Sequence, residues 1–263
     1  MKYCLVEQRV LVEDIELQNV MPVLGQFELR DAAFETSQPA PVKAGVRSIA
    51  IVFDNPDGGV PVGLKWTLDG LFGPFPTDPN DEISQTMISL GYRDFDLSST
   101  AELLWNTPRT ELSGNLAVSG ANMGSLSATA QIGGVSQEQL ITNPSSALMT
   151  AMAATLKAAT IEIENRGLAE RLIGQDAVKT KRSPEQIKKA YASVAAASLQ
   201  LYLGANETAM RLTRSIVRFI ENPTKFSITA QSKNKAGVGI ADTTLAEEPG
   251  AIIDLFDITT SSD

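Results

Sequence analysis

The residues of this chain that could do chemistry are limited to carboxylates, hydroxyls and a few cations. The 263 residues include no His and one Cys, Cys4. This composition excludes a Ser-His-Asp triad, a His general base, a His-ligated metal, a cysteine-rich zinc site and an intrachain disulfide. Gly-rich phosphate-binding loops and the Gly-x-Ser-x-Gly elbow are also absent. The sequence therefore predicts no catalytic residue, no cofactor and no metal ligand.

Carboxylates supply the remaining candidates for chemistry. The clusters at 54–58 and 78–82 carry the oxygen ligands that Ca²⁺ prefers, but neither forms a twelve-residue loop with a terminal Glu. A tight turn and a helix start are the favoured interpretations. Glu162 and Glu164 lie two residues apart in a strand-like segment, so they share one face. That spacing suits a carboxylate-only hydrolase acting on glycans and, more simply, the solvated side of a strand.

A group of basic residues on one predicted helix is the remaining candidate for a binding site. Residues 206–221 have the pattern of an amphipathic helix, with Arg211, Arg214 and Arg218 within about 60° of one another and apolar residues opposite. A solvated face, or one paired with the protein's own carboxylates, is the favoured interpretation. The functional hypothesis is contact with an anionic surface such as lipid head groups. Nearby basic residues extend the group: Lys179, Lys181, Arg182, Lys188 and Lys189.

Period-two alternation predicts strands in the first half of the chain. Leu64, Trp66 and Leu68 should be buried together on one sheet face, with Lys65, Thr67 and Asp69 on the other. Turn-forming connections favour consecutive antiparallel strands. A short helix is expected at 81–90. Further strands are predicted at 27–34, 49–53, 95–105, 112–118 and 125–132.

Helix signals dominate the second half. Asn143-Pro144 predicts a helix that runs towards Lys157. Residues 183–186, Ser-Pro-Glu-Gln, predict a capping box for a helix that ends near Gly204, and Asn206 is expected to cap the next helix. Shorter elements are predicted as a strand at 160–164, a helix at 167–178 and strands at 226–230 and 252–258.

Together these signals predict an α+β fold: a curved antiparallel meander followed by a helical segment and closing β-strands. Residues 1–263 are expected to form a single α+β domain. It is mainly sheet over 1–135, mainly helical over 136–222, and closed by strands over 223–263. The chain enters a strand-like pattern almost at once, which suits either the start of a natural domain or a piece of a longer protein.

Charge is distributed unevenly along the chain. The formal net charge is −9, which makes nucleic acid an unfavourable partner. Residues 165–218 nevertheless hold ten Lys and Arg against four Asp and Glu, whereas residues 112–156 contain one charge, Glu138. A sheet whose outer face carries Ser and Thr either packs on the protein itself or meets an apolar partner, and the first is the commoner case.

The hydrophobic spacing and the turn residues of 85–260 resemble those of a group of bacterial proteins. The pattern includes residues 90–92, Leu-Gly-Tyr, the alternating strands through Trp105 and Gly124–Ala128, and a helix that runs through Phe219 and Pro223 into a strand. It resembles uncharacterised proteobacterial envelope proteins of the YdgA-like and AsmA-like kind. The resemblance implies a β-rich periplasmic or envelope-associated protein with a role in lipid movement or outer-membrane homeostasis.

We therefore expect a non-enzymatic bacterial envelope protein that handles lipid or supports outer-membrane homeostasis. A concave apolar sheet face would shelter acyl chains without any chemistry. Two alternatives remain open: a protein-interaction or assembly module that pairs through a sheet edge, and the carboxylate-only hydrolase. The expected partners are a lipid or membrane surface, or another protein. No segment reaches the roughly 18 apolar residues that span a bilayer, so the location is implied by the resemblance alone.

Overall fold

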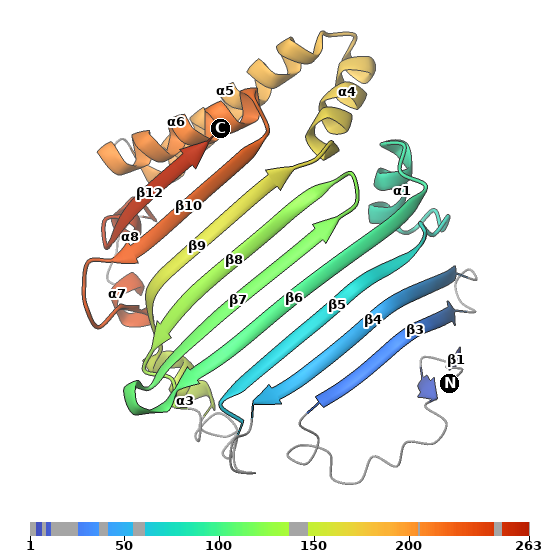
Figure 1. Ribbon diagram of the computed structural model, residues 1–263. Helices are drawn as coiled ribbons and strands as arrows, with labels where there is room; N and C mark the ends of the chain where they lie inside the picture. Colours follow the sequence, from blue (N-terminus) through green and yellow to red (C-terminus); the bar gives the residue numbers. More distant parts are fainter. Residues whose placement is uncertain are drawn as a thin grey trace. The chain divides into compact units, whose positions relative to one another are not determined.

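A computed structural model describes residues 4–6, 9–11, 26–36, 42–54, 61–136, 147–204, 206–244 and 249–262. Its main element is a ten-stranded antiparallel sheet that does not close on itself (Figure 1). The strand order is β3-β4-β5-β6-β7-β8-β9-β10-β12, with β11 paired to β9, while β1 and β2 form a separate pair. Sequential strands are neighbours along most of this order, so the predicted α+β meander is confirmed.

The strands are β1 (Cys4–Val6), β2 (Arg9–Leu11), β3 (Gln26–Thr36), β4 (Val42–Asp54), β5 (Gly63–Pro74), β6 (Asp94–Asn106), β7 (Glu111–Gly120), β8 (Gly124–Gly133), β9 (Thr155–Asn165), β10 (Lys225–Ser232), β11 (Val238–Gly239) and β12 (Phe256–Ser262). The helices are α1 (Glu82–Ser89), α3 (Ala147–Ala153), α4 (Leu168–Thr180), α5 (Pro184–Leu203), α6 (Glu207–Glu221), α7 (Ile240–Thr244) and α8 (Pro249–Ile253). A 3₁₀ turn, η1 (Thr107–Arg109), connects β6 and β7.

The chain forms two compact units. Unit 1 comprises residues 1–102 and 118–122, and unit 2 comprises residues 103–117 and 123–263. The assignment of residues 1–263 to one domain stays a prediction. Among the described residues, no helix combines the length and apolar composition needed to cross a bilayer.

Unit 1 contains the long strands β3, β4 and β5. The register pairs Trp66 with Ile51 and Leu68 with Ile49, so these apolar side chains share one face. Trp66 is half-buried, and its Nε1 donates a hydrogen bond to Ser99 Oγ at 3.1 Å. The predicted alternation is thus present, but burial is less complete than predicted. Leu64, Trp66 and Leu68 are all half-buried rather than fully buried.

The helices of unit 2 begin and end where their capping residues place them. Ser183 and Gln186 form the predicted capping box of α5, and Gly204 is its C-cap. Asn206 Oδ1 accepts the Ala209 N–H at 2.7 Å and caps α6. Helix α5 packs on α6 and α4, and α6 packs on β12 and β10 (Figure 1).

Two predicted boundaries in unit 2 are wrong. The helix expected to run towards Lys157 ends at Ala153, because β9 begins at Thr155 and pairs with both β8 and β10. Sheet pairing on two sides outweighs the local helix preference of an Ala-rich segment. The strand expected at 252–258 is divided into α8 and β12. The Asn143-Pro144 signal and most of the 54–58 cluster lie outside the described residues.

Candidate functional site

The sheet of unit 2 carries one apolar and one polar face. Residues opposite one another in an antiparallel pair share a face, and successive residues alternate between faces. Ile161 lies opposite Ala128 on one side and Ile228 on the other, and Ile228 lies opposite Thr260. We call the surface that contains Ile161 the apolar face. In β8, β9 and β10 it is formed by Leu126, Ala128, Ala130, Ile132, Ala159, Ile161, Ile163, Phe226, Ile228 and Ala230.

The apolar face is largely uncovered in the described part of unit 2. Phe226 is 7% exposed and packs against Phe219 of α6, with ring centroids 5.7 Å apart. The other residues of this face are half-buried or exposed, and Leu126 and Ile161 remain 45% and 43% exposed. The covering helix, α6, contacts β10 and β12. An apolar surface of this kind is typical of binding sites rather than of a free monomer surface.

The opposite, polar face is solvated and ion-paired. Thr160 and Thr229 share a hydrogen bond of 3.0 Å between their hydroxyls. Glu162 lies 3.8 Å from the Lys225 amine, and Glu164 accepts a hydrogen bond of 3.1 Å from Arg166 Nε. That hydrogen bond holds the pKa of Glu164 below its ordinary value. A glycosidase general acid needs a raised pKa, so the direction of this shift does not favour the hydrolase alternative.

An ion pair of unit 2 has a testable pH dependence. Lys157 Nζ donates to Glu111 Oε1 at 2.6 Å, and this hydrogen bond lowers the pKa of Glu111 below its ordinary 4.5. A carboxyl with a lowered folded-state pKa stabilises the protein above its unfolded pKa, and that contribution is lost as the pH falls through the folded pKa. We expect Lys157→Met to flatten the loss of stability between about pH 5 and pH 3.

Urea unfolding midpoints measured across this pH range test the pair. The matched control is Lys235→Met, which removes an exposed lysine from a turn without changing Glu111. Parallel pH curves for wild type and Lys157→Met would show that the pair does not contribute.

Helix α6 is anchored to the apolar face by one side and exposes its basic side. Ala209 and Leu212 are 1% and 8% exposed, and the Ser215 and Thr260 hydroxyls are 2.6 Å apart. The predicted amphipathic pattern therefore corresponds to the packing, because the residues at apolar positions face the protein.

The three predicted site residues of α6 are exposed. Arg214 Nε donates to the Met210 carbonyl at 3.3 Å, and among the described residues none of the three guanidinium groups forms an ion pair with a carboxylate. Their surroundings differ, because Arg211 lines a pocket whereas Arg214 and Arg218 do not line it. Their predicted contact with an anionic surface stays a prediction.

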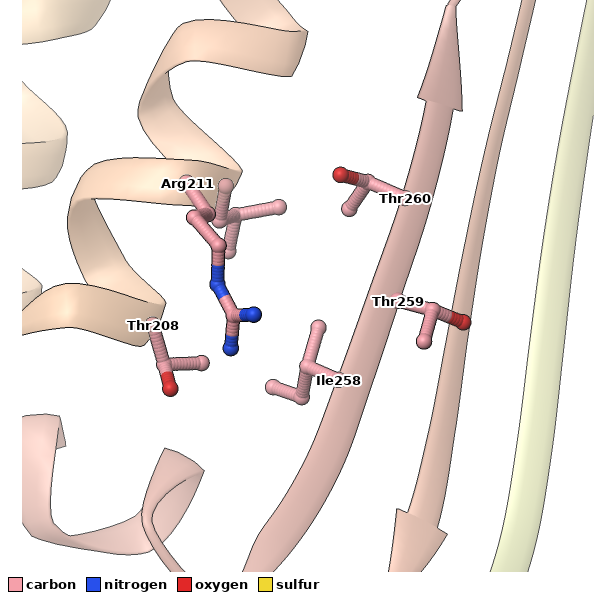
Figure 2. A pocket seen from close by; sticks show the side chains of 6 residues that line it. Thr208, Arg211, Ile258, Thr259 and Thr260 are labelled. Atoms are coloured by element: carbon pink, nitrogen blue, oxygen red, sulfur yellow. The ribbon is translucent and has the colours of Figure 1, made fainter.

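The pocket at Arg211 has a volume of about 210 Å³ and opens between α6 and β12. Thr208, Arg211 and Leu212 line it from the helix, and residues 258–260 line it from the strand. Figure 2 shows the Arg211 guanidinium in the space between helix and strand, while the Thr259 side chain points to the other side of β12. The pocket therefore combines one cation, hydroxyls and apolar walls.

Unit 1 contains a second pocket, in which the lining cation is already paired with carboxylates of the protein. Arg47 donates hydrogen bonds of 2.8 and 3.2 Å to the two carboxylate oxygens of Asp96, and its Nε lies 3.7 Å from Asp69. The hydrogen bonds to Asp96 raise the pKa of Arg47. This pocket of about 460 Å³ is also lined by Phe72 and Phe95. Because its cation is already paired, it is a weaker site for an anion.

The acidic cluster at 78–82 forms a helix start, as predicted. Asp81 caps α1 by accepting hydrogen bonds from the Ser84 hydroxyl at 2.6 Å and the Ser84 N–H at 3.1 Å, and these bonds lower the pKa of Asp81. In the described part of the chain, no three Cys, Asp or Glu side chains gather as a metal site would require.

Two parts of the candidate site were missed from the sequence. Thr208 and Thr260 join Arg211 in the pocket, although β12 is distant in sequence from α6. The signal available in the sequence was the uncharged segment that follows Asp257. In this segment, which forms the rest of β12, Thr259 and Thr260 lie on opposite faces of the strand.

Residues 117–263 match a protein family whose description reads "Uncharacterized protein". The matched segment is more than half of the chain and contains α6, the pocket and strands β8 to β10 and β12. No curated protein matches the chain.

Proposed function

The chain belongs to this family of uncharacterised proteins, and from its geometry we propose that it is a non-enzymatic protein that binds lipid on the apolar face of unit 2. The observation that carries the proposal is the exposure of Leu126 and Ile161 in the middle of that face. Exposed apolar surface is unfavourable in water by about 25 cal/mol per Å², so an acyl chain that covers it is bound without any chemistry.

The residues of the apolar face suit an acyl chain better than a compact ligand. Side chains on one face of a strand repeat about every 7 Å, and neighbouring strands are about 5 Å apart. Small residues adjoin the two larger ones: Ala128 follows Leu126 on this face and lies opposite Ile161, and Ala130 and Ala159 form the next pair along the strands. The surface is therefore shallow and extended, and a flexible hydrocarbon can follow it.

We also propose that this function belongs to the bacterial envelope, as it does in the AsmA-like and YdgA-like proteins that the sequence resembles. The support for this placement is the resemblance of residues 85–260 described above. The exposed Arg214 and Arg218 suit a position beside anionic lipid head groups, where each basic residue contributes about 1 kcal/mol to membrane binding.

Native mass spectrometry of protein purified without detergent tests the proposal. We expect a population heavier than the bare chain by the mass of a lipid, with the added mass lost on delipidation and identified as lipid in the extract. Protein that emerges at its bare mass and cross-links to a protein partner in cell extracts would instead support assembly through a sheet edge.

A further inference from the structure

We propose that the pocket at Arg211 binds the acidic head group of an amphiphile, a carboxylate or a phosphate monoester, whose chain lies on the apolar face. This inference rests on the proposed lipid-binding function and adds to it a residue that selects the head group. It also separates Arg211 from Arg214 and Arg218, which the sequence pattern treats as equivalent.

The charge of Arg211 is available to a ligand. In the described part of unit 2 its guanidinium has neither an ion-pair partner nor a hydrogen-bond acceptor, and the side chain is exposed while lining the pocket. Guanidinium presents several N–H donors in a planar fork that matches two oxygens of a carboxylate or phosphate. An anionic oxygen pair therefore supplies the acceptors that the protein itself does not supply.

Hydroxyl groups add donors next to this cation. Thr208 lines the pocket one helical turn before Arg211, and Figure 2 shows the Arg211 guanidinium in the space between α6 and β12 with the Thr208 side chain below it. Thr260 Oγ1 lies 2.6 Å from Ser215 Oγ, and either hydroxyl can be the donor. When Ser215 donates, the Thr260 hydroxyl hydrogen is free to point at an anionic oxygen.

The size of the pocket restricts it to a head group. Its volume of about 210 Å³ is below the roughly 300–1,000 Å³ of pockets that enclose whole drug-sized ligands. A carboxylate or phosphate fits this space, whereas a long acyl chain has to continue outside it.

The sheet register connects the pocket to the apolar face. Thr260 lies opposite Ile228, and Ile228 lies opposite Ile161, so these three residues form one row across β12, β10 and β9. Two strand spacings, about 10 Å, separate Thr260 from the exposed Ile161. A head group at Arg211 therefore places the first part of its chain within reach of apolar side chains.

Titration calorimetry with four probes tests the inference: dodecyl phosphate, dodecanoate, the neutral dodecyl maltoside and inorganic phosphate. We expect wild type to bind both acidic amphiphiles about 10-fold more tightly than the maltoside, as a charge-assisted bidentate contact implies. Arg211→Gln should remove this preference and leave maltoside binding unchanged. The control Lys235→Gln, which removes an exposed cation from a turn outside the pocket, should keep the preference.

Each contrary result identifies what fails. Equal wild-type affinity for acidic and neutral amphiphiles, or a preference that survives Arg211→Gln, overturns the head-group site and leaves lipid binding standing. Inorganic phosphate that binds as tightly as dodecyl phosphate overturns the amphiphile as ligand, because the chain would then contribute nothing. Failure of wild type to bind any of the three amphiphiles overturns the proposed function itself.

Discussion

The double variant Leu126→Gln/Ile161→Gln should bind dodecyl maltoside about 30-fold more weakly than wild type. Full burial of a Leu or Ile side chain contributes about 1.5–3 kcal/mol, and these two residues are 45% and 43% exposed before a ligand arrives. Covering what is exposed is therefore worth about 1 kcal/mol for each, and about 2 kcal/mol corresponds to roughly 30-fold in affinity. Because the maltoside head group is neutral, the charge of Arg211 does not contribute to this measured affinity.

The matched control for the double variant is Thr129→Gln. Thr129 is an exposed residue of β8 on the polar face, opposite Thr160. The Thr129→Gln substitution introduces Gln into β8, as Leu126→Gln does, so it reproduces any effect of Gln on the stability of that strand. We expect binding within about twofold of wild type. If control and double variant weaken binding equally, the apolar face is not where the chain lies.

Leu212→Ala should lower the free energy of unfolding by about 3 kcal/mol. Leu212 is 8% exposed at the contact of α6 with the sheet, and Leu-to-Ala substitutions in cores cost about 2–5 kcal/mol because a cavity remains. Urea denaturation followed by circular dichroism measures the loss. The helix is fixed at its start by Asn206, so the substitution loosens packing without removing the cap.

Arg214→Ala is the control for this substitution. It lies on the exposed side of the same helix, and surface substitutions usually change stability by less than about 0.5 kcal/mol. If Leu212→Ala lowers the free energy of unfolding by no more than Arg214→Ala does, the contact of Leu212 with the sheet does not hold α6 in place.

Local signals in the sequence predicted the helical part of this structure well. Ser183 with Gln186 and Asn206 mark helix starts because their side chains bond to N–H groups within three residues, and such contacts are readable from spacing. The end of α3 was predicted too late because Lys157 pairs with residues distant in sequence, including Glu111. Long-range pairing of this kind leaves no local pattern.

The site could be predicted only in part for the same reason. The exposed side of α6, with Arg211, Arg214 and Arg218, follows from helical period alone. The difference between Arg211 and the other two depends on which strand lies beside the helix, and that strand, β12, begins 45 residues after Arg211. The exposure of Ile161 likewise depends on how many strands α6 covers. That number is set by tertiary packing, and the alternation of apolar and polar residues along a strand does not reveal it.

Photo-crosslinking with a fatty acid that carries a diazirine near the end of its chain tests the central claim most directly. After irradiation and digestion, we expect labelled peptides from β8 and β9, with modifications at or beside Leu126 and Ile161. The Leu126→Gln/Ile161→Gln variant should lose the label, and Thr129→Gln should keep it. Labelling confined to other parts of the chain, or labelling of β8 and β9 that is equal in all three proteins, would contradict the binding of acyl chains on the apolar face.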